Sequence, residues 1–212
     1  MASALRAKLE EVKSSGALHA AFNDSFMGDE GCLILKEMLA NNRKLRSLDL
    51  RGCNIHCDGA VALASLLDGA GIKHPSSTEG SMQAHALQTL GLEWNGLGTF
   101  ESGVQAMCKA ISNNATLTDL DLRNNSISPQ GGAAIGAMLA RNSTLKKLDL
   151  RWNNIGAQGG KALVDSIASN PHSAITEILV AGNKIPEATL GELQALSERN
   201  ASNPPPPPPP GG

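Results

Sequence analysis

Apolar residues recur along the chain in an eleven-residue pattern, with an aliphatic side chain at the first, fourth, sixth and eleventh positions. Five stretches follow it: LRSLDLRGCNI (45–55), LQTLGLEWNGL (87–97), LTDLDLRNNSI (117–127), LKKLDLRWNNI (145–155) and ITEILVAGNKI (175–185). The alternation around the fourth to sixth positions is typical of a short strand with one buried face. The pattern therefore predicts repeated copies of one structural unit.

A second pattern lies between the copies and predicts a helix. A glycine is followed four and eight residues later by apolar residues, as in Gly59, Leu63 and Leu67. This spacing places the apolar side chains on one face of a helix. Each unit is therefore expected to be strand, turn, helix and turn. Such units stack side by side, because none can bury its apolar face alone.

The distances between copies predict where the domain begins, ends and is interrupted. The closing aliphatic residues are 42, 30, 28 and 30 residues apart. The Gly-, Ser- and Pro-rich stretch 69–84 accounts for the first, longer step and is expected to be an inserted surface loop. A last helix is expected to begin with Pro186 in its first turn. The predicted domains are an N-terminal helix or cap (1–16), a repeat domain (17–200) with a degenerate copy at 17–44 and full copies starting at 45, 87, 117, 145 and 175, and a polyproline tail (201–212).

The pattern resembles the leucine-rich repeat of the ribonuclease-inhibitor subfamily over nearly the whole chain. This resemblance implies an α/β fold, a right-handed solenoid or horseshoe with parallel strands on the concave face and helices on the convex face. Four strings also resemble the repeat region of a centrosome-linker protein: LEWNGLG (92–98), LDLRNNSIS (120–128), LDLRWNNIG (148–156) and AGNKIP (181–186). That second resemblance implies a place in centrosome, cilium or cytoskeleton assembly. The long coiled coil of that protein is not found here, so its fibre-forming role is not carried over.

The ninth position of each copy is expected to stabilise the fold as a structural ladder. Its side chain points inward, where a buried amide can donate to and accept from the backbone of the neighbouring turn. The ladder residues are Cys53, Asn95, Asn125, Asn153 and Asn183.

Two rows of outward side chains are expected on the concave face, because alternate strand residues share a face. The rows are Asp49, Gly91, Asp121, Asp149 and Leu179, and Arg51, Glu93, Arg123, Arg151 and Ala181. Asp and Arg side chains of neighbouring rows are expected to pair. Two interpretations stay open: a solvated ionic lattice of little energetic value, or a surface that binds a protein partner.

Trp94 and Trp152 stand just before the ladder residue in copies two apart. They are therefore expected about 10 Å apart on one rim of the concave face. Exposed tryptophans are favoured as anchors of protein interfaces. The hypothesis is that a partner protein binds there, and the alternative is that both side chains pack over a neighbouring loop.

Charge and composition exclude several other partners. The chain has 18 Lys and Arg against 20 Asp and Glu, whereas nucleic-acid and anionic-membrane binders usually carry a basic excess. No apolar run is long enough to span a membrane, and the first residues, MASALRAKLEEVKSSG, do not form a signal peptide. The four cysteines are interpreted as reduced thiols. A cytoplasmic protein that binds neither nucleic acid nor membrane is expected.

The run Pro204–Pro210 predicts a polyproline II segment. It resembles ligands of profilin and of SH3-type domains, which bind such segments in aromatic-lined grooves. A stiff spacer is the alternative.

Catalytic and metal sites are not expected. Cys53, His56 and Cys57 lack a fourth zinc ligand, and Cys53 belongs to the inward ladder. GAQGGKA (156–162) has neither the spacing nor the Ser or Thr of a phosphate loop. The histidines have no partner at a recognisable spacing. No cofactor, metal or catalytic residue is therefore predicted.

The predicted function is a non-enzymatic scaffold that binds a protein partner on its concave face. The alternative is a GTPase-activating protein similar to the Ran activator, which presents an arginine and an asparagine from the same repeat subfamily. Arg51, Arg123 and Arg151 would be the candidate arginines. The acidic tail typical of that activator is not found in this sequence.

Overall fold

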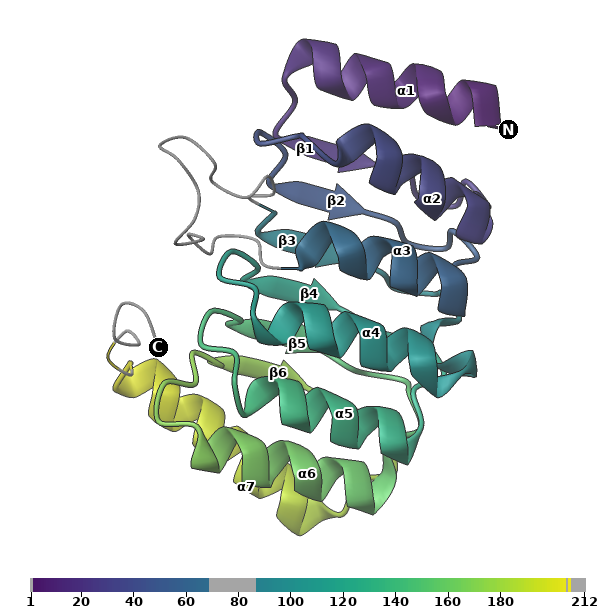
Figure 1. Ribbon diagram of the computed structural model, residues 1–212. Coiled ribbons are helices and arrows are strands. Elements are labelled where there is room, and N and C mark those ends of the chain that lie inside the picture. Colours follow the sequence, from purple (N-terminus) through teal and green to yellow (C-terminus); the bar gives the residue numbers. More distant parts are fainter. Residues whose placement is uncertain (1, 69–86, 205, 207–212) are drawn as a thin grey trace.

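The structure is a computed structural model and describes residues 2–68, 87–204 and 206. In these ranges, three-residue strands alternate with helices (Figure 1). The strands are β1 (His19–Ala21), β2 (Ser47–Asp49), β3 (Thr89–Gly91), β4 (Asp119–Asp121), β5 (Lys147–Asp149) and β6 (Glu177–Leu179). The helices are α1 (Ala2–Ser15), α2 (Gly28–Leu39), α3 (Cys57–Leu67), α4 (Glu101–Ser112), α5 (Pro129–Leu139), α6 (Gly156–Ser169) and α7 (Glu187–Ser202), with a short 3-10 helix η1 (Leu97–Thr99) before α4.

The strands form one open sheet in sequence order, and every neighbouring pair is parallel. The fourth position of each copy lies in register with its neighbours, so one layer of apolar side chains, buried except for the partly buried Ile178, runs through the sheet. Its members are Ala20, Leu48, Leu90, Leu120, Leu148 and Ile178. The predicted α/β solenoid is confirmed.

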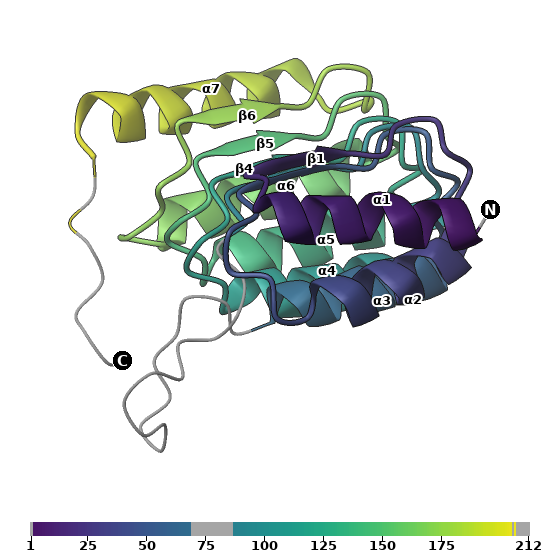
Figure 2. The same cartoon turned by 90° about the horizontal axis from the view of Figure 1, so that it is seen from above.

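The core lies between the sheet and the row of helices α2–α6 (Figure 2). The aliphatic side chains at the sixth and eleventh positions of the copies, such as Leu150 and Ile155, are buried in it, except for Ile185 of the last copy, which is partly buried. Because each unit adds only one thin layer of Leu, Ile and Ala, the core needs almost no aromatic side chains. This explains how a chain with only 2% aromatic residues forms a continuous core.

Glycines let neighbouring units approach closely. A Cβ atom at Gly98 would lie 2.7 Å from the backbone N and Cα of Ile127. At Gly136 on α5, a Cβ would lie 2.8 Å from the carbonyl oxygen of Ala162 on α6. Backbone cannot yield as a flexible side chain can, so these contacts set the spacing between units.

Helices α1 and α7 lie at opposite ends of the stack (Figure 1). Each covers the exposed end of the core with one apolar face, which includes Leu5 and Leu9 of α1 and Leu193 of α7. Helix α7 lies beside β6, out of line with the row α2–α6 (Figure 2). The prediction that Pro186 is in the first turn was wrong by one position: its ψ of 146° is extended, and the helix begins at the next residue.

Two sequence predictions fall outside the described residues. The inserted loop at 69–84 lies wholly outside the residues that the structure describes. Of the run Pro204–Pro210, only Pro204 and Pro206 are described. The Nδ1 atom of His172 lies 3.0 Å from the carbonyl oxygen of Pro206. Within the described part of the chain, no helix combines the length and the apolar character needed to cross a membrane.

Candidate protein-binding surface

A hollow of about 370 Å³ lies over the strands on the face opposite the helices. The residues of the two predicted rows line this hollow, with two exceptions. Ala181 does not line it, and Arg151 lies at the rim. A third row, two residues before the aspartate row, also lines the hollow and was not predicted, although strand alternation alone would have placed it there. Its members are Ser47, Thr89, Asp119, Lys147 and Glu177.

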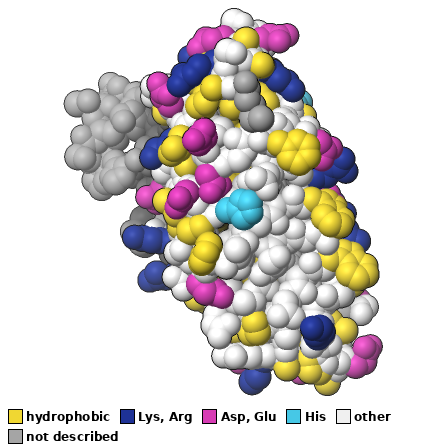
Figure 3. Space-filling view, turned by 90° about the vertical axis from the view of Figure 1, so that its right-hand side faces the viewer, with side chains coloured by type: hydrophobic (Ala, Val, Ile, Leu, Met, Phe, Trp, Pro, Cys, Tyr) yellow, Lys and Arg dark blue, Asp and Glu magenta, His cyan; other side chains and the backbone are white. Residues whose placement is uncertain are grey.

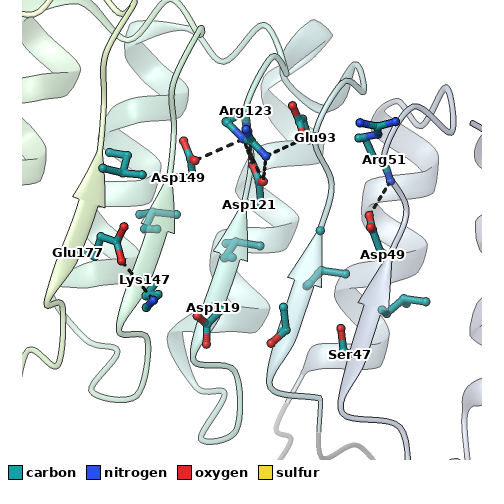
Figure 4. Close-up of a pocket in the computed structure, with 17 residues that line it drawn as sticks. Ser47, Asp49, Arg51, Glu93, Asp119, Asp121, Arg123, Lys147, Asp149 and Glu177 are labelled. Carbon is teal, nitrogen blue, oxygen red and sulfur yellow. Dashed lines mark hydrogen bonds and ion pairs between the residues drawn. The ribbon is translucent and has the colours of Figure 1, made fainter. Parts of the chain in front are cut away.

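Arg123 is the centre of the charge network on this face (Figure 4). Its guanidinium lies 2.6 Å from a carboxylate oxygen of Asp121, 2.7 Å from Glu93 and 3.3 Å from Asp149. The hydrogen bonds to Asp121 raise the pKa of Arg123, and the charges of Asp121, Glu93 and Asp149 act in the same direction. Carboxylates from three neighbouring units therefore hold one cation in place.

The other two arginines are also paired with carboxylates. Arg51 contacts Asp24 of the first unit at 3.1 Å, while Arg151 contacts Asp149 at 2.6 Å. Hydrogen bonds to these carboxylates raise the pKa of both guanidinium groups. Each candidate arginine of the concave face thus already has an anionic partner within the chain.

Trp94 and Trp152 lie at the rim where the strands lead into the turns. The exposed fraction is 60% for Trp94 and 63% for Trp152. Large hydrophobic side chains gather along one edge of this side of the molecule (Figure 3). Trp152 also covers the next turn, because a Cβ at Gly182 would lie 2.7 Å from its ring. Packing over a neighbouring turn therefore leaves most of the indole accessible.

The backbone at both tryptophans is left-handed, with φ of 57° at Trp94 and 58° at Trp152. The equivalent residue has a positive φ in all six turns of the described units: Asp24, Gly52, Trp94, Asn124, Trp152 and Gly182. Gly, Asn and Asp tolerate this conformation, whereas a bulky side chain is strained in it. The turn alone therefore does not account for tryptophan at this position.

Two shallow hollows lie on either side of Trp94. One, of about 340 Å³, separates it from Trp152 and is lined by Glu93, Arg123, Asn124 and Arg151. The other, of about 430 Å³, is lined by Asp24, Phe26, Arg51, Gly52 and Asn54. Phe26, which is 69% exposed, was not predicted as part of the rim because it belongs to the degenerate first copy.

The ladder residues lie behind this rim and are buried. Asn153 Nδ2 donates to the carbonyl oxygens of Leu122 and Leu150, both at 2.9 Å, and its Oδ1 accepts from the backbone N–H groups of Asn125 and Ile127, both at 3.0 Å. In the unit with cysteine, Cys53 Sγ donates to the carbonyl oxygen of Phe22 at 3.1 Å. These contacts join each turn to the one before it and hold the rim rigid.

A second ladder of asparagines lies on the opposite edge of the stack, where the helices end. Asn142 Nδ2 donates to the carbonyl oxygens of Ile111 at 2.7 Å and Asn114 at 3.1 Å, while its Oδ1 accepts from Leu145 N at 2.8 Å. Asn114 and Asn170 make equivalent contacts. Each asparagine thus satisfies a carbonyl oxygen at the end of the preceding helix.

Residues 41–64, 113–136 and 141–164 match the family model described as Leucine Rich repeat. These segments are leucine-rich repeats. Leucine-rich repeat-containing protein 45 of Gallus gallus is 36% identical over 127 residues, which is 58% of this chain and 17% of that protein. The predicted resemblance of the chain to a leucine-rich-repeat protein of this kind is confirmed. The chain spans only a small part of the relative's length.

Solved leucine-rich-repeat-like domains share the fold. The structure titled Leiomodin-1 Actin-Binding Site 2 has a TM-score of 0.60 and 16% identity, covering 81% of this chain and 88% of that one. The tropomodulin C-terminal domain of Caenorhabditis elegans has a TM-score of 0.52 and 13% identity, covering 94% and 93%. At these identities the likeness concerns the fold alone.

The cysteines belong mainly to the core. Burial raises the pKa of Cys32 and of Cys108 to about 12, and it also raises the pKa of Cys53. A thiol that holds its proton this firmly is a poor nucleophile and a poor metal ligand. Across the described ranges, no three His, Cys, Asp or Glu side chains are grouped so as to hold a metal ion.

Proposed function

We propose that the chain is a non-enzymatic scaffold that binds a protein partner on its concave face. Trp94 and Trp152 would anchor the partner at the rim, and the rows that contain Asp49, Arg123 and Asp149 would contact it on the floor. The observation that carries the proposal is the pair of exposed indoles in a strained backbone conformation. Strain at a position that Gly, Asn or Asp occupies elsewhere in the chain points to a binding role.

The charge network supports a protein partner by its rigidity. Arg123 is held by three carboxylates, so the floor presents a fixed pattern of alternating charge. Fixed charges select a complementary partner and orient its approach more than they add affinity. The aromatic anchors would then supply most of the binding energy.

The proposal is tested by affinity capture from the native cytosol. Wild-type chain, the Trp94→Ala/Trp152→Ala double variant and a Phe100→Ala control are compared, because Phe100 is an exposed aromatic residue that lines neither rim hollow. Capture is expected to be lost in the double variant and kept in the control, with unchanged circular dichroism in both. A partner that the double variant still retains would refute the proposal.

The alternative, a GTPase-activating protein of the Ran-activator type, needs an arginine free to reach the nucleotide. Arg51, Arg123 and Arg151 are each paired with a carboxylate of the chain, and this pairing favours the scaffold. Single-turnover GTP hydrolysis with a Ran-type GTPase separates the two functions. Acceleration that is lost on Arg123→Ala would favour the activator, and no acceleration would remove it.

The proposal also concerns where in the cell the chain acts and what its proline run binds. We place the chain in the cytoplasm, in association with the cytoskeleton, centrosome or cilium, because of its resemblance to leucine-rich repeat-containing protein 45. The similar leiomodin-1 structure is that of an actin-binding site of leiomodin-1. Co-sedimentation with filamentous actin would test the same partner for this chain. Profilin or an SH3-type domain is the proposed external receptor for Pro204–Pro210.

A further inference from the structure

We infer that the rim between Trp94 and Trp152 binds the proline run Pro204–Pro210 of a second copy of this chain in the polyproline II conformation. The inference rests on the proposed function, because it names the chemistry of a partner at the same rim. Four observations support it: the spacing of the two indoles, their unused donors, the neutralised arginines and the positions of helix α7 and Pro206.

The spacing of the indoles fits a polyproline II helix. Trp94 and Trp152 belong to units two apart in a parallel in-register sheet, so their backbones are about 9.6 Å apart. A polyproline II helix rises about 9.3 Å in one turn of three residues. Prolines three apart in the run would therefore stack on the two indoles, with the two residues between them over the hollow of about 340 Å³.

The rim offers hydrogen-bond donors that suit a proline run. Proline has a carbonyl acceptor and no backbone N–H, so a run of prolines presents acceptors alone. Within the described residues, neither the indole Nε1 of Trp94 nor that of Trp152 donates a hydrogen bond, and the side-chain amide of Asn124 makes none. These groups all border the hollow and can donate to carbonyl oxygens of the bound segment.

The arginines of this hollow argue for an uncharged ligand. Arg123 contacts three carboxylates, and Arg151 contacts Asp149. An anionic peptide would have to displace these pairs, whereas a proline run leaves them intact. A preformed polyproline II segment also loses little conformational entropy when it binds.

The position of the tail favours a second copy over the same chain. Helix α7 runs back across the stack from the last rim turn to the opposite edge (Figure 2). Its 16 residues span about 24 Å. Beyond it, the carbonyl oxygen of Pro206 lies 3.0 Å from Nδ1 of His172, which precedes β6 on the edge opposite the rim turns. The described residues therefore place the start of the proline run away from the rim of its own chain, which favours a second copy.

Intrinsic fluorescence tests binding directly, because the chain has two tryptophans and no tyrosine. The host is the full chain with Pro204–Pro210 replaced by serine, and the titrant is the synthetic peptide SNPPPPPPPGG. A saturable change in emission is expected, with affinity weakened about tenfold or more in Trp94→Ala, whose remaining Trp152 still reports binding. Phe100→Ala should bind as the host does, and a peptide with alanine for every proline should give no change.

Sedimentation velocity tests the second copy. The full chain is expected to associate with rising concentration, and both the serine-tail variant and the Trp94→Ala/Trp152→Ala variant should stay monomeric. No fluorescence response to the peptide would overturn the inference, although Trp-dependent capture from cytosol would still uphold the proposed function. A response to the peptide without self-association would assign the rim to the proline run of another protein and overturn the second copy as its occupant.

Discussion

Replacing Asn153 with alanine is expected to lower the free energy of unfolding by about 3 kcal/mol, because buried backbone groups lose their hydrogen-bond partner. The N–H groups of Asn125 and Ile127 and the carbonyl oxygens of Leu122 and Leu150 all contact this one amide. Alanine offers no replacement for these hydrogen bonds. Urea denaturation followed by circular dichroism measures the change.

Asn154→Ala is the matched control for this prediction. Asn154 is the next residue in the chain, but it is exposed, and its side chain only accepts a hydrogen bond from Lys184 Nζ at 3.3 Å. Its substitution should change the free energy of unfolding by less than about 0.5 kcal/mol. Equal effects of the two substitutions would show that the ladder does not hold the turns together.

Replacing both rim tryptophans with asparagine is expected to abolish partner binding without lowering stability. Asparagine already occupies the equivalent left-handed position as Asn124, so Trp94→Asn and Trp152→Asn keep the turn and remove its strain. The expected melting temperature equals or exceeds that of the wild type, while binding weakens at least a hundredfold through the loss of two anchors. Differential scanning calorimetry and a binding isotherm on the same samples measure both quantities.

Two outcomes would contradict this prediction. A melting temperature more than about 5 °C lower, which corresponds to roughly 1 kcal/mol or more, would assign the tryptophans a structural role over their neighbouring turns. Binding that persists in the asparagine variant would move the partner site away from the rim. Both outcomes leave the leucine-rich-repeat fold itself unaffected.

The order of the strands and helices could be predicted because each unit repeats one pattern with a defined period. Leu48, Leu120 and Leu148 recur at the same position, and their alternation with polar residues determines both the buried face and the register. The inward ladder position could be recognised for the same reason. In a stack of similar layers, the local pattern and the global fold carry the same information.

Features that depend on contacts between units could not be predicted from the pattern. The sequence does not tell that Arg51 pairs with Asp24 and not with Asp49, since that choice depends on side-chain rotamers. The second asparagine ladder belongs to the connecting segments, which the eleven-residue pattern does not cover. The left-handed turns and the exposure of Phe26 concern positions inside the copies at which that pattern requires no apolar residue. A comparison of the residue at this left-handed position in each turn would have given one useful signal. Asp, Gly or Asn occupies it in the other described turns, and tryptophan in two.

The proposed function makes the two exposed indoles on one rim the anchors of a protein interface. Fluorine NMR of the chain labelled with 5-fluorotryptophan observes both anchors at once, because the two tryptophans give two signals in any complex. In the free chain, both signals should respond to solvent exchange between H₂O and D₂O. On addition of the captured partner, both should shift together and lose that response. Two signals that stay unchanged while the partner is bound would contradict the claim.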